Sequence, residues 1–164
     1  MIKVEPLDAR KPEVRALLDE ADAFSKKLYP ADGRRPVDQE FLASPAVRLF
    51  VARIEKQAVG CAALVLAGNG CAELKRMIVR AEARGRGAGH CLIKHIEAAA
   101  LAGHVRTIML ETGPLNREAL SLYRRCGYRE RGPFGSYCAS PHSVFMEKRL
   151  LAQTRNPSRS CTDC

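Results

Sequence analysis

The alternation of apolar and polar positions divides the first half of the chain into short strands and one long helix. Four runs have the length and the apolar content of strands, namely residues 2–7, 47–54, 58–66 and 71–79. A helix is predicted to begin at Pro12, because Val14, Leu17 and Leu18 follow it at helical spacing. Asn69-Gly70 supplies the positive φ angles of a tight turn between the last two strands. This half therefore predicts an antiparallel meander with a helix after its first strand.

The second half changes to a helical period after a glycine-rich segment, ARGRGAGH at residues 83–90. Leu92, Ile96 and Ala99 form one stripe of the helix that follows this segment. Asn116 is suited to be the N-cap of another helix. The remaining predicted elements are a short helix over 37–42 and strands over 105–112, 128–131 and 143–150.

These elements predict a mixed α/β (α+β) domain with a largely antiparallel sheet of six to seven strands flanked by about four helices. The strand–helix–strand unit of residues 71–112 is expected to be a parallel crossover. We expect a single domain over residues 1–151. The polar residues 152–164 are expected to form a disordered tail.

The chain is basic, with a formal net charge of +9 and a pI near 9.5. Such a charge attracts polyanions, which include nucleic acids, acidic membrane surfaces and phosphorylated cofactors. Aromatic and basic residues form no common stripe, so we expect no nucleic-acid partner. No apolar stretch is long enough to span a membrane, and the N-terminus has no secretory pattern. A cytoplasmic protein without a membrane partner is therefore expected.

The seven cysteines are scattered through apolar segments, and their odd number does not suggest a disulfide framework. The final C-x-x-C, Cys161 to Cys164, lacks a second pair or neighbouring histidines. We therefore expect no metal.

The glycine-rich segment joins a predicted strand to a predicted helix, an arrangement that binds anions through backbone N–H groups. A plain turn would need one glycine, whereas Gly85, Gly87 and Gly89 together suggest that a ligand comes close to the backbone. A P-loop is excluded, because no Lys-Ser/Thr pair follows the glycines. A dinucleotide fold would need further parallel units, and the preceding hairpins argue against it. A coenzyme A site is the third option.

Two motifs resemble landmarks of the GNAT family of N-acetyltransferases. RGRGAG, Arg84 to Gly89, is similar to the family's [QR]-x-x-G-x-[GA] motif. NREALSLYRRCGY at 116–128 is similar to its N-x-x-A-x-x-L-Y-x-x-x-G-[FY] motif. The segment 132–150 resembles the C-terminal part of bacterial YsnE-like acetyltransferases, so the resemblance covers roughly residues 1–150. It implies the GNAT fold and a coenzyme A cofactor.

The resemblance also implies how such a cofactor is held. The amides of the glycine loop would hold the pyrophosphate, and the backbone of the fourth strand would pair with the pantetheine arm. The implied cofactor-binding residues are Met77, Val79, Arg84, Gly85, Arg86, Gly87, Ala88, Gly89, Asn116 and Tyr123.

Three residues are the implied catalytic groups. Tyr123 lies two helical turns after Asn116 and would act as general acid toward the leaving thiolate. A carboxylate must take the proton of the amine, and Glu73 is preferred to Glu111 for this role. Alternative roles are a core tyrosine and solvated or ion-paired carboxylates.

Acceptor recognition is expected from the segment between the first two helices and from the loop before the last strand. The candidate residues are Tyr29, Arg34, Arg35, Phe134, Tyr137 and His142. The expected activity is acetyl-CoA-dependent transfer to a primary amine of a small molecule or peptide. The alternative is a non-catalytic module that binds acetyl-CoA for regulation. The sequence fixes neither the acceptor nor the oligomeric state, for which a homodimer is one option.

Overall fold

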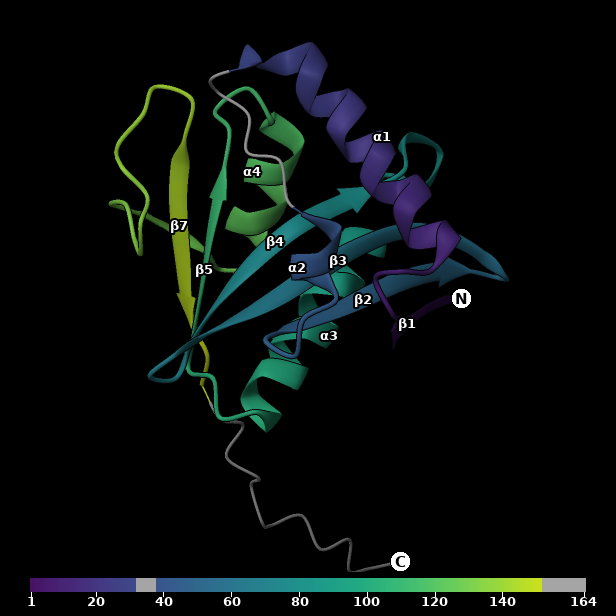
Figure 1. The fold of residues 1–164 in the computed structure, drawn as a ribbon, viewed down its shortest axis with the longest axis horizontal. Coiled ribbons are helices and arrows are strands. Elements are labelled where there is room, and N and C mark those ends of the chain that lie inside the picture. Colours follow the sequence, from purple (N-terminus) through teal and green to yellow (C-terminus); the bar gives the residue numbers. More distant parts are fainter. Residues whose placement is uncertain (32–37, 152–164) are drawn as a thin grey trace, which may run out of the picture.

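The computed structural model describes residues 1–31 and 38–151, and its elements follow the predicted order (Figure 1). The helices are α1 (Pro12–Leu28), α2 (Gln39–Leu42), α3 (Ala88–Ala102) and α4 (Arg117–Arg125), with a 3-10 turn over Ala81–Ala83. The strands are β1 (Ile2–Pro6), β2 (Val47–Ile54), β3 (Gln57–Gly68), β4 (Cys71–Val79), β5 (Thr107–Thr112), β6 (Arg129–Arg131) and β7 (Val144–Arg149). Arg34, Arg35 and the expected tail over 152–164 lie outside the described residues.

Within the described part of the chain, the seven strands form one sheet in the order β1-β2-β3-β4-β5-β7-β6. The only parallel pair in this part is β4–β5, as predicted for the 71–112 unit. This pairing runs from Cys71–Thr107 to Leu74–Leu110 and then stops. Figure 1 shows β4 and β5 diverging beyond that point, with α4 beside β5. The predicted fold class is confirmed, and the divergence opens the sheet in its middle.

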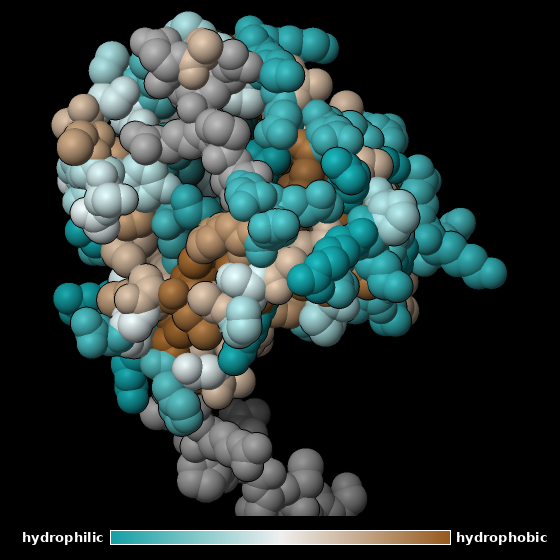
Figure 2. Space-filling view, viewed as in Figure 1, coloured by the Kyte–Doolittle hydropathy of each residue, from teal (hydrophilic) through white to brown (hydrophobic). Residues whose placement is uncertain are grey.

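The helices cover both faces of the sheet. On one face, α3 buries Leu92, Ile93 and Ile96 completely, and each contributes about 1.5–3 kcal/mol relative to an exposed side chain. On the other face, α1 buries Val14 and Leu17 in a second apolar cluster. Figure 2 shows this second face, with polar side chains over α1 and apolar side chains gathered over strands that α1 does not cover.

A bulge in β4 changes which face its side chains occupy. Cys61 of β3 pairs with Ile78, but Ala63 pairs with Lys75, so two residues of β4 lie opposite one of β3. Arg76 in the bulge has a positive φ of 54°, and its Nη2 lies 2.7 Å from Asp22 Oδ1 of α1. Side chains before the bulge keep one alternation, and those after it take the opposite one. The sequence pattern of 71–79 gave no sign of this bulge.

The packing of β4 side chains shows this change of alternation at the bulge. Leu74 belongs to the cluster under α3, so its neighbours Glu73 and Lys75 face the α1 side. Met77 and Val79 pack against the α3 cluster, whereas Ile78 packs against the α1 cluster. Met77 and Val79 therefore share a face of the sheet. Strand β4 therefore contributes side chains to the apolar clusters on both faces of the sheet.

Several predicted strand ends differ from the observed ones by one or two residues, and at one of them the structure shows the reason. The strand predicted over 105–112 begins at Thr107. Val105 and Arg106 instead close the turn after α3, where the Arg106 N–H donates to the Gly70 carbonyl at 2.6 Å and the Val105 N–H to Ala100.

Candidate active site

A cavity of about 880 Å³ lies where β4 and β5 diverge, and we call it the splay cavity. Its walls come from α1, β4, the loop before α3, the end of β5 and α4. Its glycine-loop half comprises the loop over 84–89 with Asn116 and Tyr123. Its carboxylate half comprises Tyr29, Glu73, Lys75, Glu111 and Tyr137. Because Tyr123 packs in the α3 cluster and Glu73 faces the α1 side, the cavity connects both faces of the sheet.

Glycine is favoured at the three loop positions for different physical reasons. Gly85 and Gly87 have φ angles of +72° and +91°, which side chains disfavour. At Gly85 a Cβ would meet none of the described atoms within 4 Å, so the backbone there is open. At Gly89 a Cβ would lie 2.8 Å from Leu122 Cδ2 of α4, so a side chain here would push the end of Leu122 aside. At Gly89, therefore, the group that comes close to the backbone is the Leu122 side chain of α4.

The loop ends at the N-terminus of α3, where Gly87 is the N-cap. The first amides of a helix have no intrahelical acceptors and carry positive potential. Gly87, Ala88 and Gly89 all line the splay cavity at this point. The arrangement fits an anionic group such as a pyrophosphate.

The two arginines of the loop occupy different places. Arg84 lines the cavity and folds across it: its Nε donates to the Val79 carbonyl at 3.1 Å, and its Nη1 lies 3.1 Å from Glu118 Oε2 of α4. Its guanidinium also lies 5.3 Å from the ring centroid of Phe24. Arg86 is exposed and does not line the cavity.

Helix α4 presents Asn116 and Tyr123 to the cavity. Asn116 is the N-cap, as predicted, and its Oδ1 accepts from the Ala119 N–H at 3.4 Å. Tyr123 is 5 % exposed, and none of the described residues hydrogen-bonds its hydroxyl. Burial raises the pKa of Tyr123 above its ordinary value, and the nearby Cys126 and Glu111 raise it further. The phenol therefore holds its proton firmly at neutral pH.

Tyr29, at the end of α1, reaches across to the start of α4. Its Oη accepts from the backbone N–H groups of Leu115 at 2.9 Å and Asn116 at 3.2 Å. A Cβ at Gly113 would lie 1.9 Å from this oxygen, so only glycine fits there while Tyr29 keeps its place. Burial raises the pKa of Tyr29, although the two backbone donors oppose the rise. Tyr29 thus connects α1 with the helix that carries Tyr123.

The two glutamates of the carboxylate half have different partners. Tyr137 Oη donates to Glu73 Oε1 at 2.5 Å, and Lys75 Nζ lies 3.1 Å from the same oxygen. Glu111 accepts from Ser143 Oγ at 2.8 Å. Both carboxylates line the cavity, at the point where β4 and β5 part.

Among the described candidates for acceptor recognition, Phe134 and His142 are not in the cavity wall. Phe134 is buried in an aromatic cluster, 5.0 Å from the Tyr137 ring and 5.8 Å from the Phe145 ring, centroid to centroid. His142 lies edge-on to Tyr29, with ring centroids 6.4 Å apart. Phe134 and His142 can therefore act on a ligand only through the tyrosines they touch.

Two partners of the cavity carboxylates escaped the sequence analysis. Lys75 stands two positions after Glu73 in a strand, and this spacing alone places both on one face. Ser143 is separated from Glu111 by 32 positions, and only the β5–β7 pairing brings them together. The first could have been found by strand periodicity, the second only from the fold.

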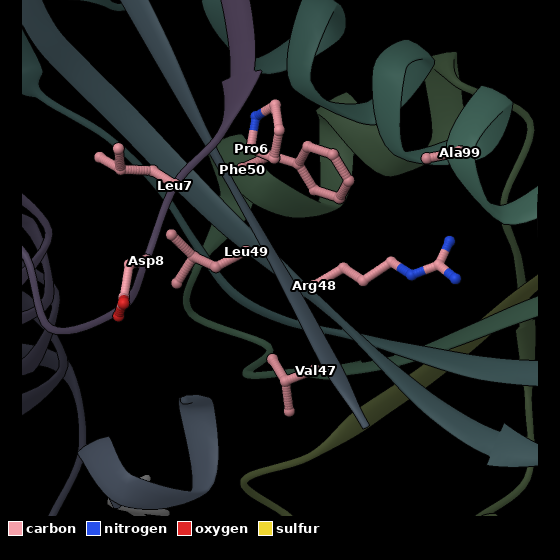
Figure 3. Close-up of a pocket in the computed structure, with 8 residues that line it drawn as sticks. All are labelled: Pro6, Leu7, Asp8, Val47, Arg48, Leu49, Phe50 and Ala99. Carbon is pink, nitrogen blue, oxygen red and sulfur yellow. The ribbon is translucent and has the colours of Figure 1, made fainter. Parts of the chain in front are cut away.

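A second hollow of about 520 Å³ lies by β1 and β2, away from these residues (Figure 3). Its charged side chains are Asp8 and Arg48, which Figure 3 shows pointing in different directions on opposite sides of β2. Asp8 is moreover paired with Arg10. This hollow brings no catalytic groups together.

In residues 1–31 and 38–151, no group of three or more His, Cys, Asp or Glu side chains could hold a metal ion. No helix in the same part of the chain has the length and apolarity that crossing a membrane requires.

Relatives with named activities share most of this chain. An IAA acetyltransferase of Azospirillum brasilense is 41% identical over 135 residues, which are 82% of this chain and 88% of that protein. The uncharacterized N-acetyltransferase YsnE of Bacillus subtilis is 30% identical over 152 residues, 91% of this chain and 99% of that protein. The resemblance to YsnE-like proteins is thereby confirmed.

The fold has a counterpart among solved structures. A candidate acyl-CoA N-acyltransferase of Klebsiella pneumoniae superposes with a TM-score of 0.79 and 32% sequence identity, over 92% of this chain and 99% of that one. The model of the acetyltransferase (GNAT) family matches residues 14–128, which include β4, the glycine loop and α4. The glycine loop, the divergence of β4 from β5, and the pair of Asn116 and Tyr123 at α4 thus have one common explanation. This chain belongs to the GNAT family of acetyltransferases.

Proposed function

We propose that the protein transfers the acetyl group of acetyl-CoA directly to a primary amine of a small molecule or peptide. One observation carries the proposal: a single cavity joins an anion-binding loop, a buried phenol that keeps its proton, and two carboxylates. The IAA acetyltransferase and N-acetyltransferase names of the two relatives support it.

The residues present fit coenzyme A. The glycine loop over 84–89 and the N-terminus of α3 would hold the pyrophosphate, with Gly85 leaving room for close approach. Beyond Leu74, the edge of β4 that faces β5 pairs with no described strand. This edge would accept the pantetheine arm beside Met77 and Val79. Bound there, acetyl-CoA supplies the acetyl group as a thioester.

The protein's own groups then handle two protons. Glu73, whose side chain is 14 % exposed, would take the proton of the acceptor ammonium, directly or through water. Tyr123 Oη would give its proton to the departing sulfur, and the raised pKa keeps that proton available. The second proton that the nitrogen loses on becoming an amide would return to the Tyr123 oxygen, so the net release is one proton. Glu111 is the alternative base, because it lines the same cavity and lies close enough to raise the pKa of Tyr123.

The acceptor would enter the carboxylate half. Tyr29 and Tyr137 line this half, with Phe134 and His142 behind them. Arg34 and Arg35 lie in the segment between α1 and α2 and outside the described residues, and we retain them as candidates for binding a carboxylate of the acceptor.

The experiment is steady-state thiol release from acetyl-CoA with a panel of primary amines. Tyr123→Phe is expected to lower kcat about 10²-fold or more, because a general acid contributes this much. The matched control is Tyr128→Phe, since Tyr128 is also buried but does not line the cavity. Tight acetyl-CoA binding without turnover of any amine would contradict the proposal and favour a regulatory binding module.

A further inference from the structure

Glu73, Lys75 and Tyr137 form a connected group in the carboxylate half of the splay cavity, and we call it the Glu73 cluster. Lys75 Nζ donates to Tyr137 Oη at 2.7 Å, and Tyr137 Oη donates to Glu73 Oε1 at 2.5 Å. The ammonium of Lys75 lies 3.1 Å from the same carboxylate oxygen. Hydrogen bonds with a charged partner at such distances are the stronger kind in proteins.

The ring of Tyr137 packs against two phenylalanine rings that also contact each other. Its centroid lies 5.0 Å from that of Phe134 and 5.5 Å from that of Phe145. Its backbone N–H donates to the Phe134 carbonyl at 3.0 Å, and Lys75 Nζ lies 5.2 Å from its ring centroid. A rigid ring brings its hydroxyl to one place, so the carboxylate that accepts from it has one orientation.

The carboxylate is held on one side only. The contacts of Tyr137 and Lys75 both involve Oε1, and none of the described residues hydrogen-bonds Oε2. Glu111, by comparison, is held by the single hydroxyl of Ser143. Glu73 is therefore the better oriented of the two carboxylates.

We propose that Lys75 and Tyr137 are positioning residues for Glu73: they hold Oε1 so that Oε2 is presented to the acceptor amine. This rests on the proposed function in which Glu73 takes the amine proton. Proton transfer needs hydrogen-bond distance and alignment, and a misplacement of 1 Å can lower a rate about 10²-fold. The cluster supplies this alignment before the acceptor binds.

A double-mutant cycle tests the proposal. Tyr137→Phe and Lys75→Met are each expected to lower kcat for an amine about tenfold, with KM for acetyl-CoA unchanged. In the Glu73→Gln background neither change is expected to lower kcat further, because both act through Glu73. The matched controls are Tyr128→Phe and Lys94→Met, since Lys94 faces Glu97 outside the cavity. Thermal unfolding of each variant shows whether a loss reflects folding.

The outcomes separate the two proposals. Additive losses in the Glu73→Gln background would overturn the positioning role and leave the transferase activity standing. Absence of turnover with every amine would contradict the transferase activity itself. Crystal structures of Tyr137→Phe and Lys75→Met give a readout that needs no turnover. A Glu73 carboxylate that keeps its place in both would overturn the positioning role, and a carboxylate that rotates would support it.

Discussion

The glycine-loop half and the carboxylate half of the splay cavity are built from different parts of the chain. The first relies mainly on backbone groups of the loop from Arg84 to Gly89 at the start of α3, with Asn116 and Tyr123 added from α4. The second relies on side chains from α1, β4, β5 and the segment before β7. A backbone site is fixed by local conformation, whereas a side-chain site depends on the whole sheet. The two halves should therefore respond to different substitutions.

The largest effect on acetyl-CoA affinity is expected from a side chain introduced into the loop of the glycine-loop half. Gly85→Val would impose about 1–2 kcal/mol of strain at a φ of +72° and would reorient the loop amides. We expect acetyl-CoA affinity, measured by calorimetry, to fall about tenfold or more. Gly68→Val is the matched control, since Gly68 has a φ of +79° and similarly open surroundings but lies outside the cavity. Equal losses of affinity in both variants would contradict a local role of the loop.

The next effect concerns the connection between the halves. Tyr29→Phe removes the oxygen that accepts from Leu115 and Asn116, and should lower the free energy of unfolding by about 1 kcal/mol together with kcat. Gly113→Ala should act similarly, because its Cβ would displace Tyr29. Urea denaturation measures the first effect and steady-state kinetics the second.

Tyr128→Phe is the control for this connection. Its hydroxyl is buried, and no described residue hydrogen-bonds it, so its removal should leave the stability unchanged or higher. A loss of stability equal to that of Tyr29→Phe would show that the α4 contact of Tyr29 contributes nothing specific.

A smaller effect is expected from removing the charge of Glu118, which lines the glycine-loop half. Glu118→Gln removes the carboxylate that holds Arg84, and Glu118 is largely exposed. An exposed ion pair contributes about 1 kcal/mol at most, so KM for acetyl-CoA should fall no more than about fivefold. Glu130→Gln, which breaks the exposed Arg124–Glu130 pair, should leave KM unchanged. A rise in KM for Glu118→Gln would mean that the pair helps to hold the cofactor.

The smallest effect is expected from alkaline pH. Burial raises the pKa of Tyr123 above the ordinary value near 10, so the folded protein binds this proton more tightly than the unfolded chain. The associated stability is therefore fully present below about pH 10 and is lost only at higher pH. We expect no fall of kcat from loss of this proton up to about pH 9.5. An alkaline limb near pH 8 that disappears in Tyr123→Phe would contradict this.

The order of elements could be predicted because each one carries its own local pattern. The α3 stripe, the Asn69-Gly70 turn and the Asn116 cap depend on neighbours a few positions away. The glycine loop could be predicted for the same reason. At Gly89, however, the close neighbour is the Leu122 side chain of α4, which the local pattern does not contain.

The carboxylate half was only partly predictable. The residues named for it were chosen by position, but their partners come from distant segments, as Tyr137 does for Glu73 and Ser143 for Glu111. The buried position of Phe134 follows from the β7 packing, which no local pattern contains. Sequence therefore indicated the groups and missed how they are held.

The bulge at Arg76 makes β4 two short strands placed end to end, each with its own orientation. Residues 73 and 75 can vary without turning Met77 or Val79 away from the α3 side, because the extra residue separates the two alternations. On the proposed function, substitutions at 73 and 75 would change the acceptor side of the cavity and leave the residues proposed for the donor on their own face. In this chain the point of separation is held by the contact of Arg76 with Asp22 of α1.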